Sequence, residues 1–379
     1  MTEKLYYKDS YIKEFEAEVI SSMESSDGFI TVLDRTAFFP EEGGQSADSG
    51  YIDYAKVLDV YEKQGIIYHK TDKMLPPGKV YCKLDFEERF QKMQLHTAEH
   101  ILCGIIHRLF GLDNVGFHLG DELVTFDING VLTREELDRV ETLANEAVFS
   151  NIKVRTYFPD KTELGEIEYR AKLDLTENVR LVEIGEVDTC ACCAPHVAYT
   201  GEIGLIKILD YMKHRGGLRI TMQSGHRALL DYRKKYENIL KISAMLSTPQ
   251  HETAAELERY MREVDSLRSE LKERKIHEAE LFASTFSEAQ ENRVVHFSDY
   301  TVEQMRAFAN LVKEKTRGFL VCLSGEEKNY KYLIAAKGRE LSELIKEINK
   351  NLLGRGGGRG EMVTGSFSAT LSQISEYFK

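Results

Sequence analysis

The alternation of apolar and polar positions predicts a β-rich segment over residues 1–88. Short runs rich in β-branched and aromatic residues are separated by Gly, Pro and Asp, which is typical of strands joined by turns. Their regular spacing favours a small barrel or a sandwich-like β-domain. The runs are "GFITVLD" (28–34), "YIDYAKVLDVYE" (51–62), "GIIYHK" (65–70) and "KVYCKLD" (79–85).

The pattern becomes helical between residues 87 and 110, where apolar side chains recur every three or four positions and Gly111 marks a stop. A second helix is expected over 133–150, with Thr133 as its N-cap. Together with intervening strands, these helices predict an α+β domain over residues 89–225. The strands are expected at 122–128, 153–158, 179–184, 203–211 and 217–223.

The remaining pattern predicts a helical linker and then a small α/β domain. The helical section, 226–290, is interrupted at Pro249, which cannot continue a helix. Strands and helices then alternate over 291–379, around a glycine loop, "GRGGGRG" (354–360). Apolar residues three and four apart in the linker predict a helical hairpin or a short coiled-coil seam that serves core packing. They are Leu257, Met261, Val264, Leu267 and Leu271.

Composition supports a protein of several soluble domains. The chain has 379 residues, of which 42% are hydrophobic and 30% charged. No run of apolar residues is long enough for a membrane helix, and the charged N-terminal segment lacks the apolar core of a signal peptide. We therefore expect a cytoplasmic protein.

The net charge of the chain limits how it could bind nucleic acid. A net charge of −12 argues against a protein whose whole surface binds nucleic acid. Because salt screens repulsion beyond about 10 Å, a local basic face remains compatible with this charge. Basic residues gather in two places, which are either solvated charge or an RNA-binding surface: Lys207, Lys213, His214, Arg215, Arg219, His226, Arg227, Arg233, Lys234 and Lys235, and then Lys346, Lys350, Arg355 and Arg359.

Two short motifs predict a metal site. His96 and His100 lie four residues apart and therefore project from one face of the predicted helix. Cys192 and His196 are also four apart, in "DTCACCAPH" (188–196). Three imidazoles and one thiolate form a tetrahedral donor set that suits Zn²⁺.

The cysteine pattern points the same way. Three of the six cysteines lie within four residues, which in a reducing compartment indicates metal binding more often than disulfides. Cys190 and Cys193 compete with Cys192 as ligands. Neighbouring residues of an extended segment point in opposite directions, so Cys192 and Cys193 are not expected to bind one ion together.

The histidine motif leaves other functions open. Residues 96–100 also spell H-x-x-E-H, a metalloprotease pattern. A non-catalytic adaptor that binds RNA or a synthetase, with a structural zinc, is another alternative. Four protein ligands would close the coordination sphere, whereas a catalytic zinc normally keeps one position open for water.

The motifs together resemble the editing domain of alanyl-tRNA synthetase and its free-standing AlaX-type relatives. "TAFFPEEGGQSADSGYI" (36–52) is similar to the N-terminal signature of that family, and "CCAPHVAYTGEIGLIKI" (192–208) to its Cys-x-x-x-His segment. "NVGFHLGDELVTFDI" (114–128) resembles the segment after the metal helix, and "GRGGGRGEMVTGS" (354–366) the glycine loop of the C-terminal DHHA1 domain. We find no motif of an aminoacylation domain or an ATP site.

The resemblance implies hydrolysis of the ester bond of tRNA(Ala) mischarged with serine, or with glycine. It implies zinc ligation by His96, His100, Cys192 and His196. A loop of Gly43, Gly44 and Gln45 would line the pocket for the acceptor end of the tRNA. Arg355, Gly356, Gly357, Gly358 and Arg359 would contact RNA, with the tRNA elbow or a homodimer contact as the role of the C-terminal domain.

Departures from the family pattern lie beside the expected pocket. Glu99 stands where a Thr is common, His118 falls near a usual Gln, and residues 192–196 replace Cys-Gly-Gly-Thr-His. Glu99 is our candidate for a base or an acceptor of the substrate ammonium. His118 and Gln45 are the other catalytic candidates.

Overall fold

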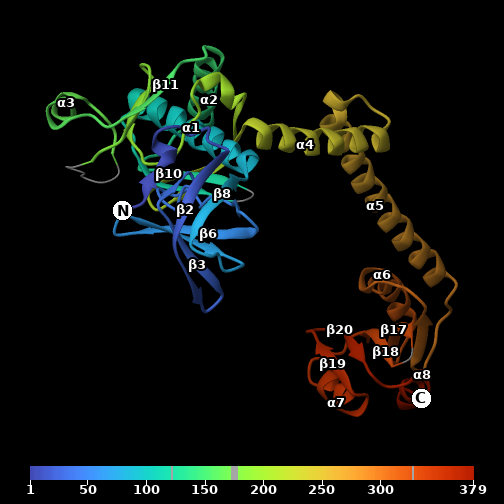
Figure 1. Cartoon of the computed structure of the whole chain (residues 1–379). Helices are drawn as coiled ribbons and strands as arrows, with labels where there is room; N and C mark the ends of the chain where they lie inside the picture. The colour runs from blue at the N-terminus through green and yellow to red at the C-terminus, as the bar shows by residue number, and fades with distance from the viewer. Residues whose placement is uncertain (121–122, 172–177, 327) are drawn as a thin grey trace. The chain divides into compact units, whose positions relative to one another are not determined.

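The computed structural model describes residues 1–120, 123–171, 178–326 and 328–379. The chain forms two compact units, Met1–Ile239 and Leu240–Lys379. Both mix helices and strands, which confirms the predicted α+β class (Figure 1). None of the described helices combines the length and the apolar content needed to cross a lipid bilayer.

The first unit begins with a closed antiparallel barrel, drawn in blue in Figure 1. Its strands are joined in the order β2-β3-β7-β6-β5-β8. Along β2, Phe15, Ala17 and Val19 are buried while the glutamates between them are exposed, so the period-two pattern sets the inside of the barrel. The strands are β2 (Glu14–Ser25), β3 (Gly28–Leu33), β5 (Gly50–Ile52), β6 (Ala55–Lys63), β7 (Ile66–Thr71) and β8 (Gly78–Leu84), with β1 (Glu3–Lys4) and β4 (Arg35–Thr36) paired outside the barrel.

A buried ion pair joins the barrel segment to the first helix, α1 (Phe86–Phe110). Arg89 of α1 donates to the carboxylate of Asp48 and, over 2.6 Å, to the carbonyl of Ala37. The same carboxylate accepts from the backbone N–H of Phe39 over 2.6 Å. These bonds tie the segment between β4 and β5 against the helix, and that segment contains Gly43, Gly44 and Gln45.

Helix α1 is the centre of the α+β part of this unit. Asp85 caps its N-terminus, and Gly111, in the left-handed conformation at φ 65°, ends it. Nearly every residue between Arg89 and Ile106 is buried, because helix α2 and two sheets surround the helix. The elements are β9 (Asn114–Leu119), β10 (Val124–Ile128), α2 (Arg134–Phe149), β11 (Val154–Tyr157), α3 (Lys161–Glu166), β12 (Leu181–Ile184), β13 (Asp188–Ala191), β14 (Ile206–His214) and β15 (Gly217–Ser224).

The two sheets have different orders. One runs β14-β15-β10-β9 and the other β11-β12-β13, and all their pairings are antiparallel. The short β13 lies against α1 and leads directly into the Cys192–His196 segment. Residue 122, at which we expected the strand of β10 to begin, lies outside the described residues.

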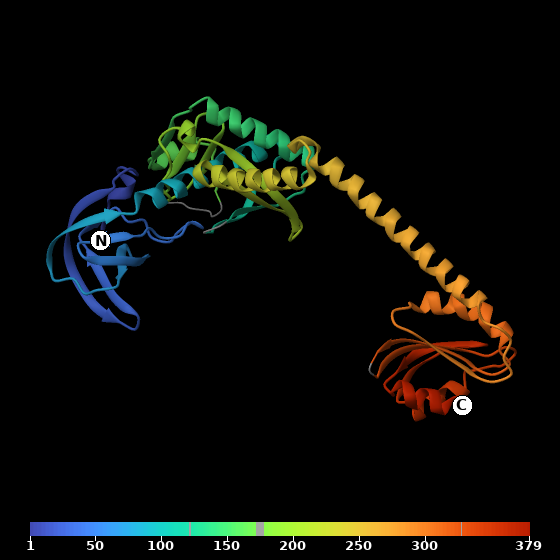
Figure 2. The same cartoon turned by 90° about the vertical axis from the view of Figure 1, so that its right-hand side faces the viewer.

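The second unit has three layers. Its sheet runs β16-β17-β18-β20-β19. Leu320 and Cys322 of β17 pack under α5 and α6, and Val321 and Leu323 pack on the other face with α7 and α8 (Figure 2, orange and red). The elements are α5 (Thr253–Ser284), β16 (Arg293–Phe297), α6 (Val302–Val312), β17 (Leu320–Glu326), β18 (Asn329–Ala335), α7 (Leu344–Asn351), β19 (Gly354–Gly357), β20 (Met362–Phe367) and α8 (Leu371–Tyr377), preceded by α4 (Gly225–Leu246).

Two expectations for this half differ from the structure. Part of the glycine loop is a strand, β19, which pairs with β20 at the edge of the sheet. Gly356 and Gly365 allow this pairing, since a Cβ on either would lie 2.6 or 2.5 Å from the hydroxyl of Tyr332. The expected apolar seam of the linker does not serve core packing within the described chain, because its side chains on α5 are exposed.

Candidate metal centre

Helix α1 presents His96 and His100 to the same side, one turn apart and both buried. Gly104, one turn further along, allows the β12–β13 turn to come close. A Cβ at Gly104 would lie 2.5 Å from the carbonyl oxygen of Val187 and 2.7 Å from the Cβ of Asp188. The absence of a side chain therefore places Asp188 directly beside His100.

The Cys192–His196 segment reaches the helix from β13. Arg180 holds its shape, because its Nη1 donates to the carbonyls of Cys192 and Ala194, each over 2.9 Å. The backbone N–H of Cys192 in turn donates to the carbonyl of Arg180 over 3.0 Å. The segment is thus fixed from one side by a single buried guanidinium.

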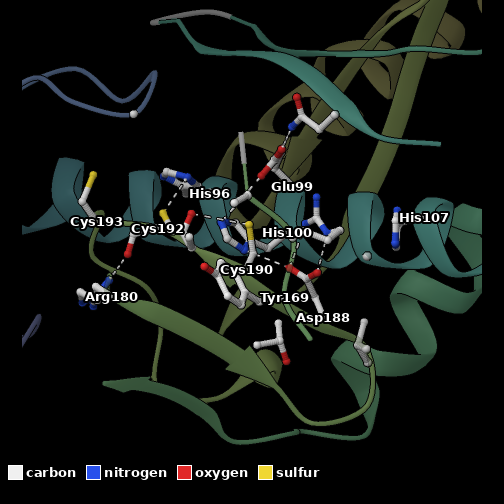
Figure 3. Close-up of a pocket in the computed structure, with 18 of the residues that line it drawn as sticks. His96, Glu99, His100, His107, Tyr169, Arg180, Asp188, Cys190, Cys192 and Cys193 are labelled. Carbon is white, nitrogen blue, oxygen red and sulfur yellow. Dashed lines mark hydrogen bonds and ion pairs between the residues drawn. The ribbon is translucent and has the colours of Figure 1, made fainter. Parts of the chain in front are cut away.

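The two segments meet at one point. One ligand atom from each of His96, His100, Cys192 and His196 lies within 4.8 Å of the other three. Figure 3 shows three of these residues, His96, His100 and Cys192. The Cys192 sulfur is 3.6 Å from Nε2 of His96 and 3.4 Å from Nε2 of His196. The structure therefore brings together the four residues that the sequence motifs singled out.

A separate partner holds the other nitrogen of each imidazole. Nδ1 of His96 lies 2.9 Å from Oε1 of Gln45, and Nδ1 of His100 lies 3.1 Å from Oδ2 of Asp188. Nδ1 of His196 lies 3.0 Å from Oγ1 of Thr97, whose own hydroxyl donates to the carbonyl of Met93. The three Nδ1–H groups are therefore donors. This leaves the Nε2 lone pairs of the neutral rings for a metal.

The charges around the site suit a bound cation. Burial opposes ionisation of Cys192, but its three imidazole neighbours together hold the pKa of its thiol well below its usual value. Burial also opposes ionisation of Asp188, yet hydrogen bonds from His100 and Arg170 hold the pKa of that carboxyl below its usual value. Arg170 donates to Asp188 over 2.7 Å. Three oriented imidazoles and a thiolate-prone cysteine fit the preferences of Zn²⁺.

The two neighbouring cysteines lie elsewhere. Cys190 is close to His100 and Asp188 and forms a second possible donor group with them. Burial raises the pKa of the Cys190 thiol to about 11. Cys193 turns away from Cys192 (Figure 3), and a Cβ on Gly43 would lie 3.5 Å from its sulfur. Cys192 is therefore the thiol best placed to act as a ligand with the histidines.

Gln45 reaches His96 through a tight turn. Gly43 and Gly44 have φ values of 65° and 85°, and Glu42 and Gln45 exchange both backbone hydrogen bonds, as in a type I′ turn. A side chain at Gly44 would collide with the carbonyl of Phe117, 2.6 Å from its Cβ. Gly43 lines the adjacent cavity, and Gln45 is fully buried behind it. Gln45 thus contacts a candidate ligand instead of lining the cavity.

The other two catalytic candidates differ sharply in position. Glu99 is buried and lines the cavity, with Oε2 4.0 Å from Nε2 of His100. Its Oε1 accepts from the side-chain amide of Asn114 and, over 3.3 Å, from the thiol of Cys103. His118 is exposed on β9 and is not among the residues that line the cavity, so its position does not favour the pocket role we expected.

The strand period explains the position of His118. Phe117 packs against His96, with ring centroids 4.8 Å apart. Successive side chains of a strand point to opposite faces, so the next residue, His118, faces away from the histidine cluster.

Three members of the cluster, His96, His100 and Cys192, line a cavity of about 920 Å³. Besides the candidate ligands, aromatic and basic side chains line it, and our sequence analysis identified none of these as site residues. They are Tyr7, Arg108, Phe158, Tyr169, Arg170 and Arg180. Asp188 and Thr97, which hold the imidazoles, were also missed, although each lies within four residues of a candidate ligand.

The predicted RNA-contact residues of the glycine loop belong to the second unit. Arg355, Gly356 and Gly357 lie in β19, and Gly358 and Arg359 follow it. Both arginine side chains are exposed. Their role in RNA contact stays a prediction.

Comparisons with known proteins cover both halves of the first unit. The family model described as the threonyl and alanyl tRNA synthetase second additional domain matches residues 179–221, which include Cys192 and His196. The model of class II (A) tRNA synthetases matches residues 2–84, which contain the barrel strands.

Similar proteins extend over nearly the whole chain. The alanyl-tRNA editing protein AlaX-L of Pyrococcus horikoshii is 31% identical over 99% of this chain and 96% of its own length. The alanine–tRNA ligase of Ignicoccus hospitalis is 30% identical over 96% of this chain but only 41% of its own length. The solved C-Ala domain of Aquifex aeolicus alanyl-tRNA synthetase covers 24% of this chain and 90% of that domain, at 19% identity and a TM-score of 0.21.

Proposed function

Because this chain belongs to the family of alanyl-tRNA editing proteins, we propose that it is a zinc-dependent trans-editing hydrolase that deacylates mischarged tRNA(Ala). Seryl esters are the first expected substrate and glycyl esters the second. One observation carries the proposal: His96, His100, Cys192 and His196 converge, and three of them, His96, His100 and Cys192, line a cavity large enough for the end of a substrate. The convergence was expected from an editing site.

These four residues would hold the ion through Nε2 of each imidazole and the sulfur of Cys192. A zinc ion bound there supplies Lewis-acid polarisation of an ester carbonyl or of a water. Gln45, Asp188 and Thr97 keep the rings oriented for this purpose. The donor set contains a thiolate and a third imidazole, which argues for this site over the carboxylate-completed site of an H-x-x-E-H protease.

Glu99 is the group of the chain that we place nearest to the reacting atoms. Its carboxylate lines the cavity beside His100, so it can accept a hydrogen bond from the ammonium or hydroxyl of a bound aminoacyl group. A site that pairs the hydroxyl of serine with a buried acceptor discriminates against alanine far better than an apolar pocket does. This provides a physical basis for cleaving seryl esters while sparing alanyl esters.

The rest of the cavity suits the single-stranded acceptor end of tRNA. Tyr7, Phe158 and Tyr169 offer aromatic faces on which bases can stack, and Arg108 and Arg180 add positive charge. The exposed Arg355 and Arg359, with the intervening glycines, would contact the tRNA elbow. We also place a homodimer contact in the C-terminal half.

A direct test offers seryl-, glycyl- and alanyl-tRNA(Ala) to the purified chain and measures release of the amino acid. We expect seryl-tRNA to be cleaved fastest and alanyl-tRNA to be spared, with activity lost to a chelator and restored by zinc. H100A should abolish cleavage, whereas H251A, at an exposed histidine of the linker, should not.

Three outcomes would contradict the proposal. Cleavage that survives complete removal of metal would exclude zinc dependence. Tight tRNA binding without any deacylation would favour the adaptor. Cleavage of casein in place of the esters would favour the protease.

A further inference from the structure

The carboxylate of Glu99 has only one oxygen left for a ligand. Its Oε1 accepts from the side-chain amide of Asn114 and, over 3.3 Å, from the thiol of Cys103. Its Oε2 makes no hydrogen bond with a described residue and lies 4.0 Å from Nε2 of His100, the nitrogen that faces the candidate metal position. Glu99 is buried, and it lines the cavity together with Asn114. Because a buried carboxylate needs donors for its oxygens, we expect a bound ligand to supply one to Oε2.

A hydrogen bond on the other side of Asn114 fixes the direction of its amide. Oδ1 of Asn114 accepts from the backbone N–H of Gly116 over 2.9 Å, so the amide nitrogen has to point towards Glu99. The same nitrogen lies 3.5 Å from the sulfur of Cys103. Asn114 is only 8% exposed, so a rotation of the carboxylate away from it would leave a buried donor unpaired.

A β-bulge turns Asn114 towards helix α1. Phe117 packs on the helix, so strict alternation along β9 would turn Val115 to the helix as well and Asn114 away from it. The register with β10 shifts at this point, and Asn114, instead of Val115, is paired with Ile128. Val115 is consequently 63% exposed, whereas Asn114 is buried. Bulges next to active sites re-aim a side chain in this way, and here the bulge brings a hydrogen-bond donor to Glu99.

The place of Oε2 favours a neutral donor from the ligand. The ammonium of an aminoacyl group would be repelled by a divalent cation bound beside His100, whereas a hydroxyl carries no charge. Serine has such a hydroxyl, and alanine lacks it. We propose that Asn114 is a positioning residue that acts through Glu99 and sets the preference of the cavity for seryl over alanyl groups. This inference rests on the proposed function, because it requires an aminoacyl group in the cavity.

Binding of two ligands that cannot be hydrolysed tests the role of Asn114. They are the seryl and alanyl amides of 3′-amino-3′-deoxyadenosine, which differ only by the hydroxyl. Calorimetric titration of the zinc-loaded wild type should show tighter binding of the seryl amide. N114D keeps an acceptor for the N–H of Gly116 but sets a second carboxylate against Glu99, which has to turn away.

The two amides should respond differently to N114D. The seryl amide should bind roughly 10- to 100-fold more weakly, as expected for the loss of one hydrogen bond to a charged group, and the alanyl amide should change by less than about threefold. N238D, which adds the same charge at an exposed position of α4, should bind both amides like the wild type. A merely structural role of Asn114 would weaken both amides equally.

The double variant E99Q/N114D restores the pair with its donor and acceptor exchanged. The new glutamine can donate to the new aspartate and present its own oxygen where Oε2 lies. In E99Q alone, Asn114 holds the oxygen of the glutamine, so the nitrogen faces the cavity instead. The double variant should therefore bind the seryl amide more tightly than E99Q does, and its midpoint of urea unfolding should exceed that of N114D. The comparison with E99Q applies even if N114D does not fold.

The outcomes separate this inference from the proposed hydrolysis. Equal weakening of both amides in N114D, or a wild type that binds the two amides equally, would overturn the role of Asn114 even if the chain cleaves seryl-tRNA. Where N114D does not fold, a double variant that binds the seryl amide no better than E99Q would overturn it as well. A chain that cleaves no ester, yet prefers the seryl amide in a way that depends on Asn114, would overturn the hydrolysis and leave this inference in place.

Discussion

The hydroxyl of Thr97 accepts a hydrogen bond from Nδ1 of His196 over 3.0 Å, while Thr97 itself lies between two other candidate ligands on helix α1. It also accepts from the backbone N–H of Val197 over 3.3 Å. One side chain of the helix thus fixes both the ring and the backbone of the distant Cys192–His196 segment.

The variant T97V should weaken metal binding while leaving the fold intact. Valine keeps the shape of threonine but leaves Nδ1–H of His196 without an acceptor. Loss of such a partner typically costs roughly 10- to 100-fold in metal affinity. Competition for zinc with a chromophoric chelator measures this loss. T142V, at an exposed position of α2, should bind zinc like the wild type; equal affinities for T97V and wild type would refute the positioning role of Thr97.

Separate serine substitutions of the two adjacent cysteines should show which of them is a metal ligand. We expect C192S to lose stoichiometric zinc, because a serine hydroxyl is a poor replacement for a thiolate ligand. C193S should retain it, since the Cys193 side chain turns away from the cluster. Atomic emission measures the zinc content of each variant. A C193S protein that lacks zinc would show that our ligand set is wrong.

The variant G104A should disturb the candidate metal site by displacing Asp188. The new methyl group would lie 2.5 Å from the carbonyl of Val187, so β13 and Asp188 must move away from α1. Overpacking of this kind costs about 1–3 kcal/mol in the free energy of unfolding. The free energy of unfolding, measured with denaturant, and the affinity for zinc should both fall. G165A, in the exposed helix α3 where nothing lies within 4 Å, is the matched control, and a G104A protein that behaves like G165A would contradict the close approach.

The variant E99Q should slow hydrolysis and alter the choice between seryl and alanyl esters. Glutamine still offers an oxygen to the amide of Asn114, so the fold should persist, but it can neither take a proton nor pair with an ammonium as strongly. If Glu99 is the base, kcat should fall roughly 100-fold or more. E87Q, exposed at the start of the same helix, serves as the control. Unchanged rate and substrate choice in E99Q would exclude the proposed role.

A pH effect is expected in the barrel, at a histidine that does not belong to the candidate metal cluster. Burial lowers the pKa of His69 to about 4 from its usual 6.5. The neutral ring is satisfied by Thr36 over 2.9 Å and by the carbonyl of Thr31 over 3.2 Å. The unfolded chain takes up a proton in this window and the folded chain does not. Stability is therefore fully present above the usual pKa and is lost as pH falls from about 6.5 towards 4.

Between pH 7 and pH 5 the loss due to His69 should be about 2 kcal/mol, from 1.36 kcal/mol per pKa unit. Urea unfolding followed by circular dichroism at both pH values measures it. H69Q should be less stable than the wild type at pH 7. Its free energy of unfolding should not show the loss between pH 7 and pH 5 that is due to His69. Equal pH dependence in the two proteins would show that His69 is not buried as a neutral ring.

Sequence patterns identified the parts of the site that follow from local periodicity. The i, i+4 spacing put His96 and His100 on one face, and the similar spacing of Cys192 and His196 marked the other half. Patterns could not show that Asp188 completes the site, because its approach depends on the glycine at position 104 of a distant helix.

The differences between expectation and structure also have specific causes. His118 was expected in the pocket, but the phase of β9 is set by Phe117, which packs on His96. The glycine loop was read as unstructured because glycine lacks strand propensity, yet at Gly356 and Gly365 only glycine allows the two strands to approach under Tyr332. The apolar repeat of α5 was expected to serve core packing, yet its side chains are exposed in the described chain, because the spacing of apolar residues does not show what covers them.

The turn at Gly43 and Gly44 links the β-rich half to the candidate metal centre. The carbonyl oxygen that steadies the ring of His96 is carried by Gln45, on the segment that runs between two barrel strands. A truncated protein that begins at α1 would keep all four donor atoms yet leave that imidazole free to rotate. We therefore expect a fragment that lacks the β-rich half to bind metal more weakly, even though none of the donor atoms comes from that half.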